Sequence, residues 1–124
     1  MALIFMLDNE RDACRLVERI LIASGHEVQA FTDESDALGW LQTNRPQLAL
    51  LDIKLNGTNV FGVLKYIRDR RPEIKVMIIT GSPSVESARK ATELGIEDCL
   101  VKPVEIAELE EHVNRALGTD SVMQ

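Results

Sequence analysis

Four polar residues stand directly after short apolar runs of the sequence. Two are acids, one carries a hydroxyl group and one is a cation: Asp8, Asp52, Thr80 and Lys102. Carboxylates at close range repel one another, and a hard divalent cation such as Mg²⁺ relieves the repulsion because it prefers oxygen ligands. A cation, a lysine and a hydroxyl group around one aspartate would hold three phosphoryl oxygens. That aspartate is then suited to attack phosphorus in line, because phosphoryl transfer needs mainly positioning and charge stabilisation.

Such chemistry requires that these residues meet at one edge of one sheet. Continuous apolar runs, typical of strands buried on both faces of a parallel sheet, occupy residues 3–7, 48–51 and 76–79. Residues 27–31 alternate between polar and apolar, as an edge strand does, and residues 99–101 form a fifth, shorter run. In a parallel sheet the reactive crevice lies outside the carboxyl ends of the strands. We therefore expect the four polar residues to converge there.

Helical patterns separate the apolar runs. Apolar residues recur with the spacing of one helix face in three segments: Ala13, Leu16, Val17, Ile20 and Leu21; Val60, Val63, Leu64 and Ile67; Ile106, Leu109, Val113 and Leu117. Residues 34–43 and 84–94 are helical in composition, and a glycine suited to a left-handed C′ position follows three of the segments, at Gly25, Gly95 and Gly118. Five strands alternating with five helices, joined by right-handed crossovers, predict an α/β fold with a doubly wound parallel sheet.

The bulk composition narrows the class of protein. A chain of 124 residues with 45% hydrophobic content suits one domain, expected over residues 1–118, with a disordered tail over 119–124. A formal charge of −6 disfavours direct binding of nucleic acid. The apolar start is too short for a membrane span and lacks the basic residues of an export signal. Cys14 and Cys99 are therefore expected to be reduced thiols in a cytoplasmic protein.

Four motifs, in this order, resemble the receiver domains of two-component response regulators, the CheY-like superfamily. They are LDNE (7–10), LLDIKLNG (50–57), IITG (78–81) and LVKP (100–103). The resemblance covers residues 2–118 and implies a flavodoxin-like sheet with the strand order 2-1-3-4-5. It also implies that Asp52 is the phosphoacceptor, that Thr80 is the switch hydroxyl and that Lys102 pairs with the phosphoryl group.

A Mg²⁺ site is also implied by the resemblance. Its ligands would be Asp8, Asn9, Asp52 and the backbone carbonyl of Lys54. Asn9 departs from the family pattern, which has a second acid at this position. An amide oxygen carries no charge, so we expect weakened Mg²⁺ affinity, for which Glu10 compensates in part.

Further departures concern the output of the domain and the lifetime of the phosphoryl group. Cys99 stands at a switch position where the family has Tyr or Phe, so the usual coupling to Thr80 cannot operate in its ordinary form. Taken by itself, Cys99 is expected to be a small core residue. The loop after Asp52 lacks the family's proline at position 56 and its Asp-Gly pair at positions 59 and 60. Lys54 and Ser82 match positions that tune how quickly water removes the phosphoryl group.

Two functions follow from these observations. In the first, a working receiver, a sensor histidine kinase or a phosphotransfer protein phosphorylates Asp52 with Mg²⁺, and the domain switches conformation. Such a domain is a signalling receiver and not an enzyme, although it assists its own phosphorylation and dephosphorylation. In the second, a degenerate receiver binds other proteins without phosphorylation, and Asn9 and Cys99 favour this alternative.

The output partner would be a downstream protein or an effector domain outside this chain, with no expected contact to nucleic acid or membrane. In receivers the faces of the fourth and fifth helices are the usual output and dimer surface, so a homodimer through them is one expectation. The charged residues there are more simply solvated: Glu86, Arg89, Lys90, Glu93, Glu105, Glu108, Glu111 and Arg115.

Enzymes on the same fold are disfavoured. A flavodoxin needs a glycine- and hydroxyl-rich loop where the acidic segment 8–12 stands, and a haloacid-dehalogenase-like phosphatase needs an acid at position 54.

Overall fold

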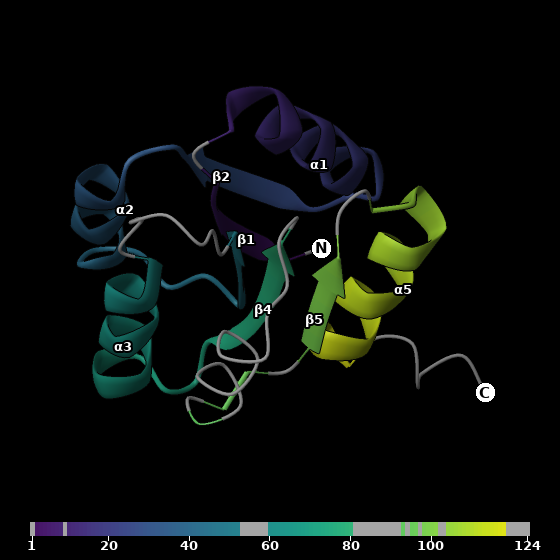
Figure 1. The fold of residues 1–124 in the computed structure, drawn as a ribbon. Helices are drawn as coiled ribbons and strands as arrows, with labels where there is room; N and C mark the ends of the chain where they lie inside the picture. The colour runs from purple at the N-terminus through teal and green to yellow at the C-terminus, as the bar shows by residue number, and fades with distance from the viewer. Residues whose placement is uncertain are drawn as a thin grey trace.

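Five parallel strands form one sheet with helices on both faces (Figure 1). The computed structural model describes residues 2–8, 10–52, 60–80, 93, 95–96, 98–101 and 104–118. The strands are β1 (Leu3–Leu7), β2 (Glu27–Phe31), β3 (Leu48–Asp52), β4 (Lys75–Thr80) and β5 (Asp98–Val101). Their order in the sheet is β2-β1-β3-β4-β5, which confirms the predicted fold and places the alternating strand β2 at an edge.

Four helices lie among the described residues: α1 (Arg11–Ala23), α2 (Glu34–Leu41), α3 (Val60–Arg70) and α5 (Ile106–Leu117). α1 and α5 cover one face of the sheet, and α2 and α3 cover the other (Figure 1). Of the helix predicted over residues 84–94, only Glu93 is described, and it is helical. The predicted tail, 119–124, lies outside the described residues. No helix in the described part of the chain is both long and apolar enough to span a membrane.

The three inner strands, β1, β3 and β4, send alternate side chains into two separate cores. In β1, Ile4 and Met6 belong to the core beneath α1 and α5, whereas Phe5 belongs to the core beneath α2 and α3. Phe5 is 0% exposed, and its ring centroid lies 5.6 Å from that of Phe31 and 5.9 Å from that of Trp40. This aromatic group fixes α2 against the centre of the sheet.

The predicted core-facing stripes of α1 and α5 are wrong at one residue each. Leu16 and Ile106 were expected on core-facing sides but are 57% and 58% exposed. In α1 the buried stripe runs through Cys14 and Val17, so Leu16 lies on its flank. Ile106 is the first residue of α5, and burial in this helix begins at Leu109. Helical periodicity thus located both helices correctly, although it assigned one exposed residue of each helix to the buried face.

The glycines that were expected to follow helices are in the left-handed region, as predicted. Their φ angles are 94° at Gly25, 72° at Gly95 and 76° at Gly118. Gly118 caps the end of α5, where its N–H donates to the carbonyl of Arg115 at 3.1 Å. A residue with a Cβ is disfavoured in this conformation, so glycine lets the chain turn away from the helix.

His26 lies between α1 and β2, and it makes folding stability sensitive to pH. The backbone N–H of Ala2 donates to its Nδ1 atom at 3.2 Å, which requires a neutral ring. Burial lowers the pKa of His26 below its ordinary value of 6.5. The unfolded state therefore binds more protons, so this contribution to stability is present above pH 6.5 and is lost as pH falls through the lowered pKa.

We expect His26→Gln to flatten the dependence of unfolding free energy on pH between about pH 7 and pH 5. Urea titrations at several pH values measure this dependence, with His112→Gln as the matched control. An unchanged slope in His26→Gln would show that other groups cause the pH dependence.

Candidate functional site

The candidate site lies at the carboxyl edge of the sheet, the edge at which the parallel strands end. Leu7, the last residue of β1, pairs with Leu51 of β3, so the next residues, Asp8 and Asp52, follow at neighbouring positions. Asp52 in turn pairs with Ile79 of β4, and Thr80 ends that strand. The structure therefore brings Asp8, Asp52 and Thr80 to one edge, where the sequence predicts them.

These three residues are the buried polar residues of the described part of the chain. Asp8 is 2% exposed, Asp52 is 4% exposed and Thr80 is 3% exposed. Burying a carboxylate costs free energy unless other groups compensate its charge. Two buried acids at the ends of neighbouring strands are therefore not explained by the packing of the sheet. Such an arrangement is typical of a functional site.

Glu10 forms an acidic cluster with Asp8 and Asp52. One carboxylate oxygen from each residue lies within 4.8 Å of those of the other two. The backbone N–H of Glu10 donates to Asp8 Oδ1 at 2.9 Å, and the N–H of Asp8 donates to the carbonyl of Phe31 at 3.0 Å. These bonds anchor Asp8 and Glu10 at the end of β1. Three carboxylates at this separation suit a hard divalent cation that is held by oxygen atoms.

The chain matches the family model described as the response regulator receiver domain, over residues 4–114. It belongs to the response regulator receiver family. The receiver fold, with its strand order and its acidic residues at the carboxyl edge, is therefore the one that the sequence motifs implied. Membership in this family also places the domain in two-component signalling.

Relatives of known role support this assignment. The nitrogen assimilation regulatory protein NtrX of Azorhizobium caulinodans is 34% identical over 118 residues, which are 94% of this chain and 26% of that protein. The DNA-binding transcriptional regulator NtrC of Klebsiella pneumoniae is 30% identical over 114 residues, 92% of this chain and 24% of that protein. The receiver thus spans about a quarter of the length of these curated relatives.

Solved structures agree with the fold. A receiver domain protein from Methanospirillum hungatei superposes with a TM-score of 0.89, covering 100% of this chain and 99% of that one, at 24% identity. NtrX from Brucella abortus superposes with a TM-score of 0.86 at 33% identity, covering 98% of this chain and 28% of that one. At 24% identity the first likeness shows the fold alone, whereas the second also supports a relation to NtrX.

Several predicted site residues of the receiver lie outside the described residues. They are Asn9, Lys54, Ser82 and Lys102. Lys102 follows Val101 in the sequence, and Val101 pairs with Thr80 across the last two strands. Val101 was expected at the buried end of its strand but is 49% exposed. Val101 lies on the same face of β5 as the exposed Cys99, opposite to the buried Leu100.

The expectation that Cys99 is a core residue is wrong. Cys99 is exposed, whereas the next residue, Leu100, is 2% exposed and belongs to the core beneath α1 and α5. Successive strand residues point to opposite faces, so Cys99 lies on the other face of the edge strand. The receiver therefore presents a thiol at its surface where the family pattern has an aromatic ring.

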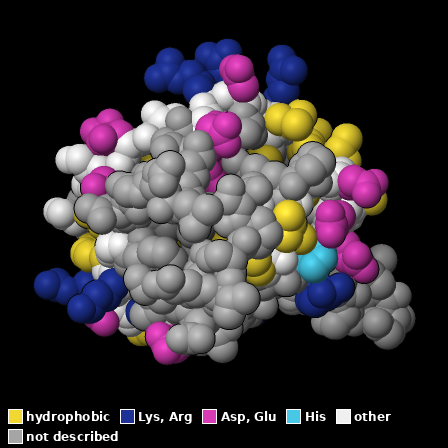
Figure 2. Space-filling model, viewed as in Figure 1, with side chains coloured by type: hydrophobic (Ala, Val, Ile, Leu, Met, Phe, Trp, Pro, Cys, Tyr) yellow, Lys and Arg dark blue, Asp and Glu magenta, His cyan; other side chains and the backbone are white. Residues whose placement is uncertain are grey.

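The charged residues of the last helix are solvated, as the simpler interpretation predicted. Figure 2 shows acidic side chains gathered at the surface over α5. The described members of the charged set are all exposed: Glu93, Glu105, Glu108, Glu111 and Arg115. Arg115 pairs with Glu111 at 3.6 Å, and both side chains are more than half exposed, so the pair adds little stability. Glu86, Arg89 and Lys90 lie outside the described residues.

Proposed function

We propose that this receiver accepts a phosphoryl group on Asp52 from a sensor histidine kinase or a phosphotransfer protein, with Mg²⁺, and changes conformation as a result. The acidic cluster carries the proposal, because Asp52 shares it with two further carboxylates within 4.8 Å. Asp52 is also 4% exposed at the end of a central strand. Its carboxylate is thus held in place at the end of the strand, which favours a reaction that depends on positioning.

Asp8, Glu10 and Asp52 would hold Mg²⁺ through carboxylate oxygens, with Asn9 and the Lys54 carbonyl as the further predicted ligands. When bound, Mg²⁺ neutralises charge on the phosphoryl oxygens. The Asp52 carboxylate forms the new O–P bond as the P–N bond of a phosphohistidine breaks. The released imidazole retains the electron pair of the broken bond and takes up a proton.

Thr80 and Lys102 supply the response in this proposal. Thr80 is buried at the end of β4, on the strand next to that of Asp52, and its hydroxyl group would turn toward a phosphoryl group there. Lys102 would pair with the same group. A phosphoryl group shifts the equilibrium between two conformations only through interactions that differ between them, and these two residues would provide that difference.

The proposed signalling role includes control of an effector. NtrC of Klebsiella pneumoniae is named as a DNA-binding transcriptional regulator, and the receiver matches about a quarter of it. By this likeness, we infer that the receiver controls an effector of that class rather than contacting DNA itself, since its own charge is −6. A phosphoryl donor of this kind acts in the cytoplasm, where we place the receiver.

Glu10 is expected to contribute to Mg²⁺ affinity in place of the missing acid at position 9. Removing its charge with Glu10→Gln should weaken Mg²⁺ binding roughly tenfold, because the carboxylate is exposed and its field is partly screened. Isothermal titration calorimetry measures the affinity, and Glu27→Gln, an exposed acid at the start of β2, is the matched control. Equal affinities in the two variants would remove Glu10 from the metal site.

Phosphoryl uptake in the presence of Mg²⁺ tests the proposed function. The receiver is incubated with a small phosphodonor and either Mg²⁺ or EDTA, and its intact mass is recorded. We expect one phosphoryl group to be gained with Mg²⁺ only, and hydroxylamine to remove it, as it does from an acyl phosphate. No gain at any Mg²⁺ concentration would favour the degenerate receiver, which the exposed Cys99 at a switch position also supports.

A further inference from the structure

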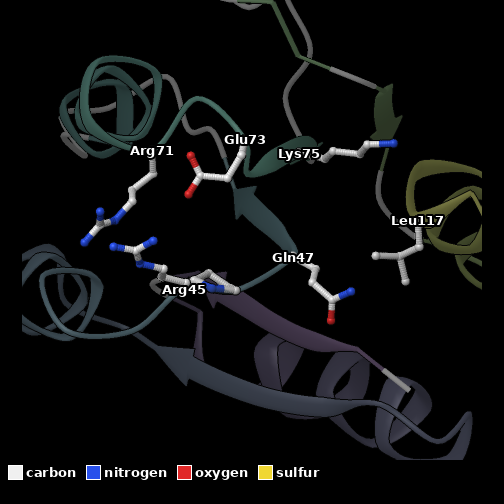
Figure 3. Close-up of a pocket in the computed structure, with 7 residues that line it drawn as sticks. Arg45, Gln47, Arg71, Glu73, Lys75 and Leu117 are labelled. Atoms are coloured by element: carbon white, nitrogen blue, oxygen red, sulfur yellow. The ribbon is translucent and has the colours of Figure 1, made fainter.

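A pocket of about 510 Å³ lies at the amino edge of the sheet, where β3 and β4 begin (Figure 3). It is therefore at the opposite edge from the acidic cluster. Residues before β3, around the start of β4 and at the end of α5 line it: Arg45, Gln47, Arg71, Glu73, Lys75 and Leu117. A volume in this range suits a small organic molecule.

The pocket is basic in an otherwise acidic receiver. Three cationic side chains, Arg45, Arg71 and Lys75, and one acid, Glu73, give its lining a net charge of +2, whereas the whole chain carries −6. Figure 3 shows the side chains of Arg45 and Arg71 extending toward one another. No ion pair joins either arginine to an acid in the described part of the chain. Two like charges that approach without such a partner create a favourable site for an anion.

A repeated sequence pattern produces this pair of arginines. Residues 45–47 read Arg-Pro-Gln before β3, and residues 71–73 read Arg-Pro-Glu before β4. The two strands are parallel neighbours, with Leu48 paired with Lys75. Segments that lead into parallel neighbouring strands lie at the same edge of the sheet, and both arginines line one pocket there. The positive charge thus results from the topology of the sheet rather than from the chance position of a flexible side chain.

Hydrogen bonds hold the walls of the pocket before any ligand arrives. The N–H of Gln47 donates to the carbonyl of Leu3 at 2.8 Å, and its Oε1 accepts from the N–H of Leu3 at 3.1 Å. The N–H of Lys75 donates to the carbonyl of Gln47 at 3.3 Å, and Arg71 Nη2 donates to the carbonyl of Gln42 at 3.4 Å. Because Gln47, the Lys75 backbone and the Arg71 side chain are already ordered, these parts of the lining lose less conformational entropy on binding.

We infer that this pocket binds a phosphorylated sugar, with its phosphate group between Arg45 and Arg71 and a sugar hydroxyl group donating to Glu73. Guanidinium groups match phosphate oxygens with paired hydrogen bonds. Lys75 extends away from the two arginines (Figure 3), so it adds positive charge to the lining without a contact to the phosphate. Glu73 would repel a ligand that is anionic throughout, so it favours one that also offers hydroxyl donors. The inference is independent of phosphorylation at Asp52.

Amide chemical shifts of the ¹⁵N-labelled receiver test this inference, using ribose 5-phosphate, AMP and inorganic phosphate at equal ionic strength. A free sugar phosphate and a nucleotide are the two sources of this chemistry, and the first two probes distinguish them. We expect saturable shifts at the amides of Arg45, Gln47, Arg71 and residues 73–75 with ribose 5-phosphate, with AMP or with both. Inorganic phosphate should bind at least about tenfold more weakly, because it lacks the hydroxyl contacts.

Arg45→Gln and Arg71→Gln should each weaken binding at least about tenfold, because each removes one charged hydrogen-bonding group. Arg45 is exposed, so its variant is not expected to disturb folding, which matters because Arg71 also bonds to Gln42. Arg19→Gln, an exposed arginine of α1, is the matched control. The inference is overturned if neither sugar phosphate gives saturable shifts, if inorganic phosphate binds equally well, or if Arg45→Gln binds as the wild type does.

Discussion

Replacing Asp52 with alanine is expected to abolish phosphoryl uptake by the receiver. Asp52 supplies both the proposed nucleophile and one of the three carboxylates of the acidic cluster, so the variant loses the attacking atom and weakens the metal site together. Loss of a nucleophile lowers such a rate by more than about 10³-fold, which leaves no phosphoryl group within the time of the assay. Intact mass spectrometry after incubation with Mg²⁺ and a phosphodonor measures the result.

Two controls separate this effect from a failure to fold. Asp69→Ala removes an exposed carboxylate from α3 and should leave phosphoryl uptake unchanged. Circular dichroism should show that Asp52→Ala retains the secondary structure of the wild type, because alanine is compatible with the end of a buried strand. Phosphoryl uptake that survives in a folded Asp52→Ala variant would identify another acceptor, and Asp8 and Glu10 are the nearest carboxylates known from the structure.

The second large effect concerns stability, and Phe5 should produce it. Phe5→Ala is expected to lower the free energy of unfolding by about 3–5 kcal/mol, because it leaves a cavity at a fully buried position. The change also removes the contacts with Phe31 and Trp40, whose ring centroids lie 5.6 Å and 5.9 Å away. A loss of this size is a large part of the roughly 5–15 kcal/mol that stabilises an ordinary domain.

Urea unfolding followed by circular dichroism measures this loss. Circular dichroism is preferred to fluorescence, because the single tryptophan is a neighbour of the substituted ring. Leu16→Ala is the informative control, since Leu16 is 57% exposed and its truncation should change stability by less than about 0.5 kcal/mol. A loss of several kcal/mol in Leu16→Ala, or none in Phe5→Ala, would contradict the assignment of these residues to surface and core.

The fold was predictable because the pattern of apolar residues in the strands differs strongly from that in the segments around them. β1 and β2 begin and end at the predicted residues, since continuous or alternating apolar runs mark buried and edge strands clearly. Burial of residues at the margins of a helix face or in a short strand was less predictable. Leu16 satisfies the helical periodicity, yet it lies on the flank of the buried stripe, because periodicity defines a face only to within about one residue. Cys99 lies in a run too short to show which side chains point outward.

The acidic cluster was largely predictable, because strand ends of a parallel sheet meet at one edge, and Asp8 and Asp52 each follow an apolar run. Glu10 was expected only as partial compensation for Asn9, and its carboxylate in fact lies within 4.8 Å of both aspartates. The basic pocket was missed, because its lining comes from segments far apart in the sequence. The signal that precedes it is the repeated Arg-Pro pair at residues 45–46 and 71–72, which becomes meaningful once β3 and β4 are known to be neighbours.

Direct localisation of the phosphoryl group tests the central claim of a receiver that is phosphorylated at Asp52. The wild-type receiver is phosphorylated with Mg²⁺ present and reduced with borohydride, which converts an aspartyl phosphate to homoserine, and its peptides are then sequenced by mass spectrometry. Homoserine at position 52, absent when Mg²⁺ is replaced by EDTA, is the predicted result. Homoserine at another position, or a phosphorylated protein with an unmodified Asp52, would contradict the proposal.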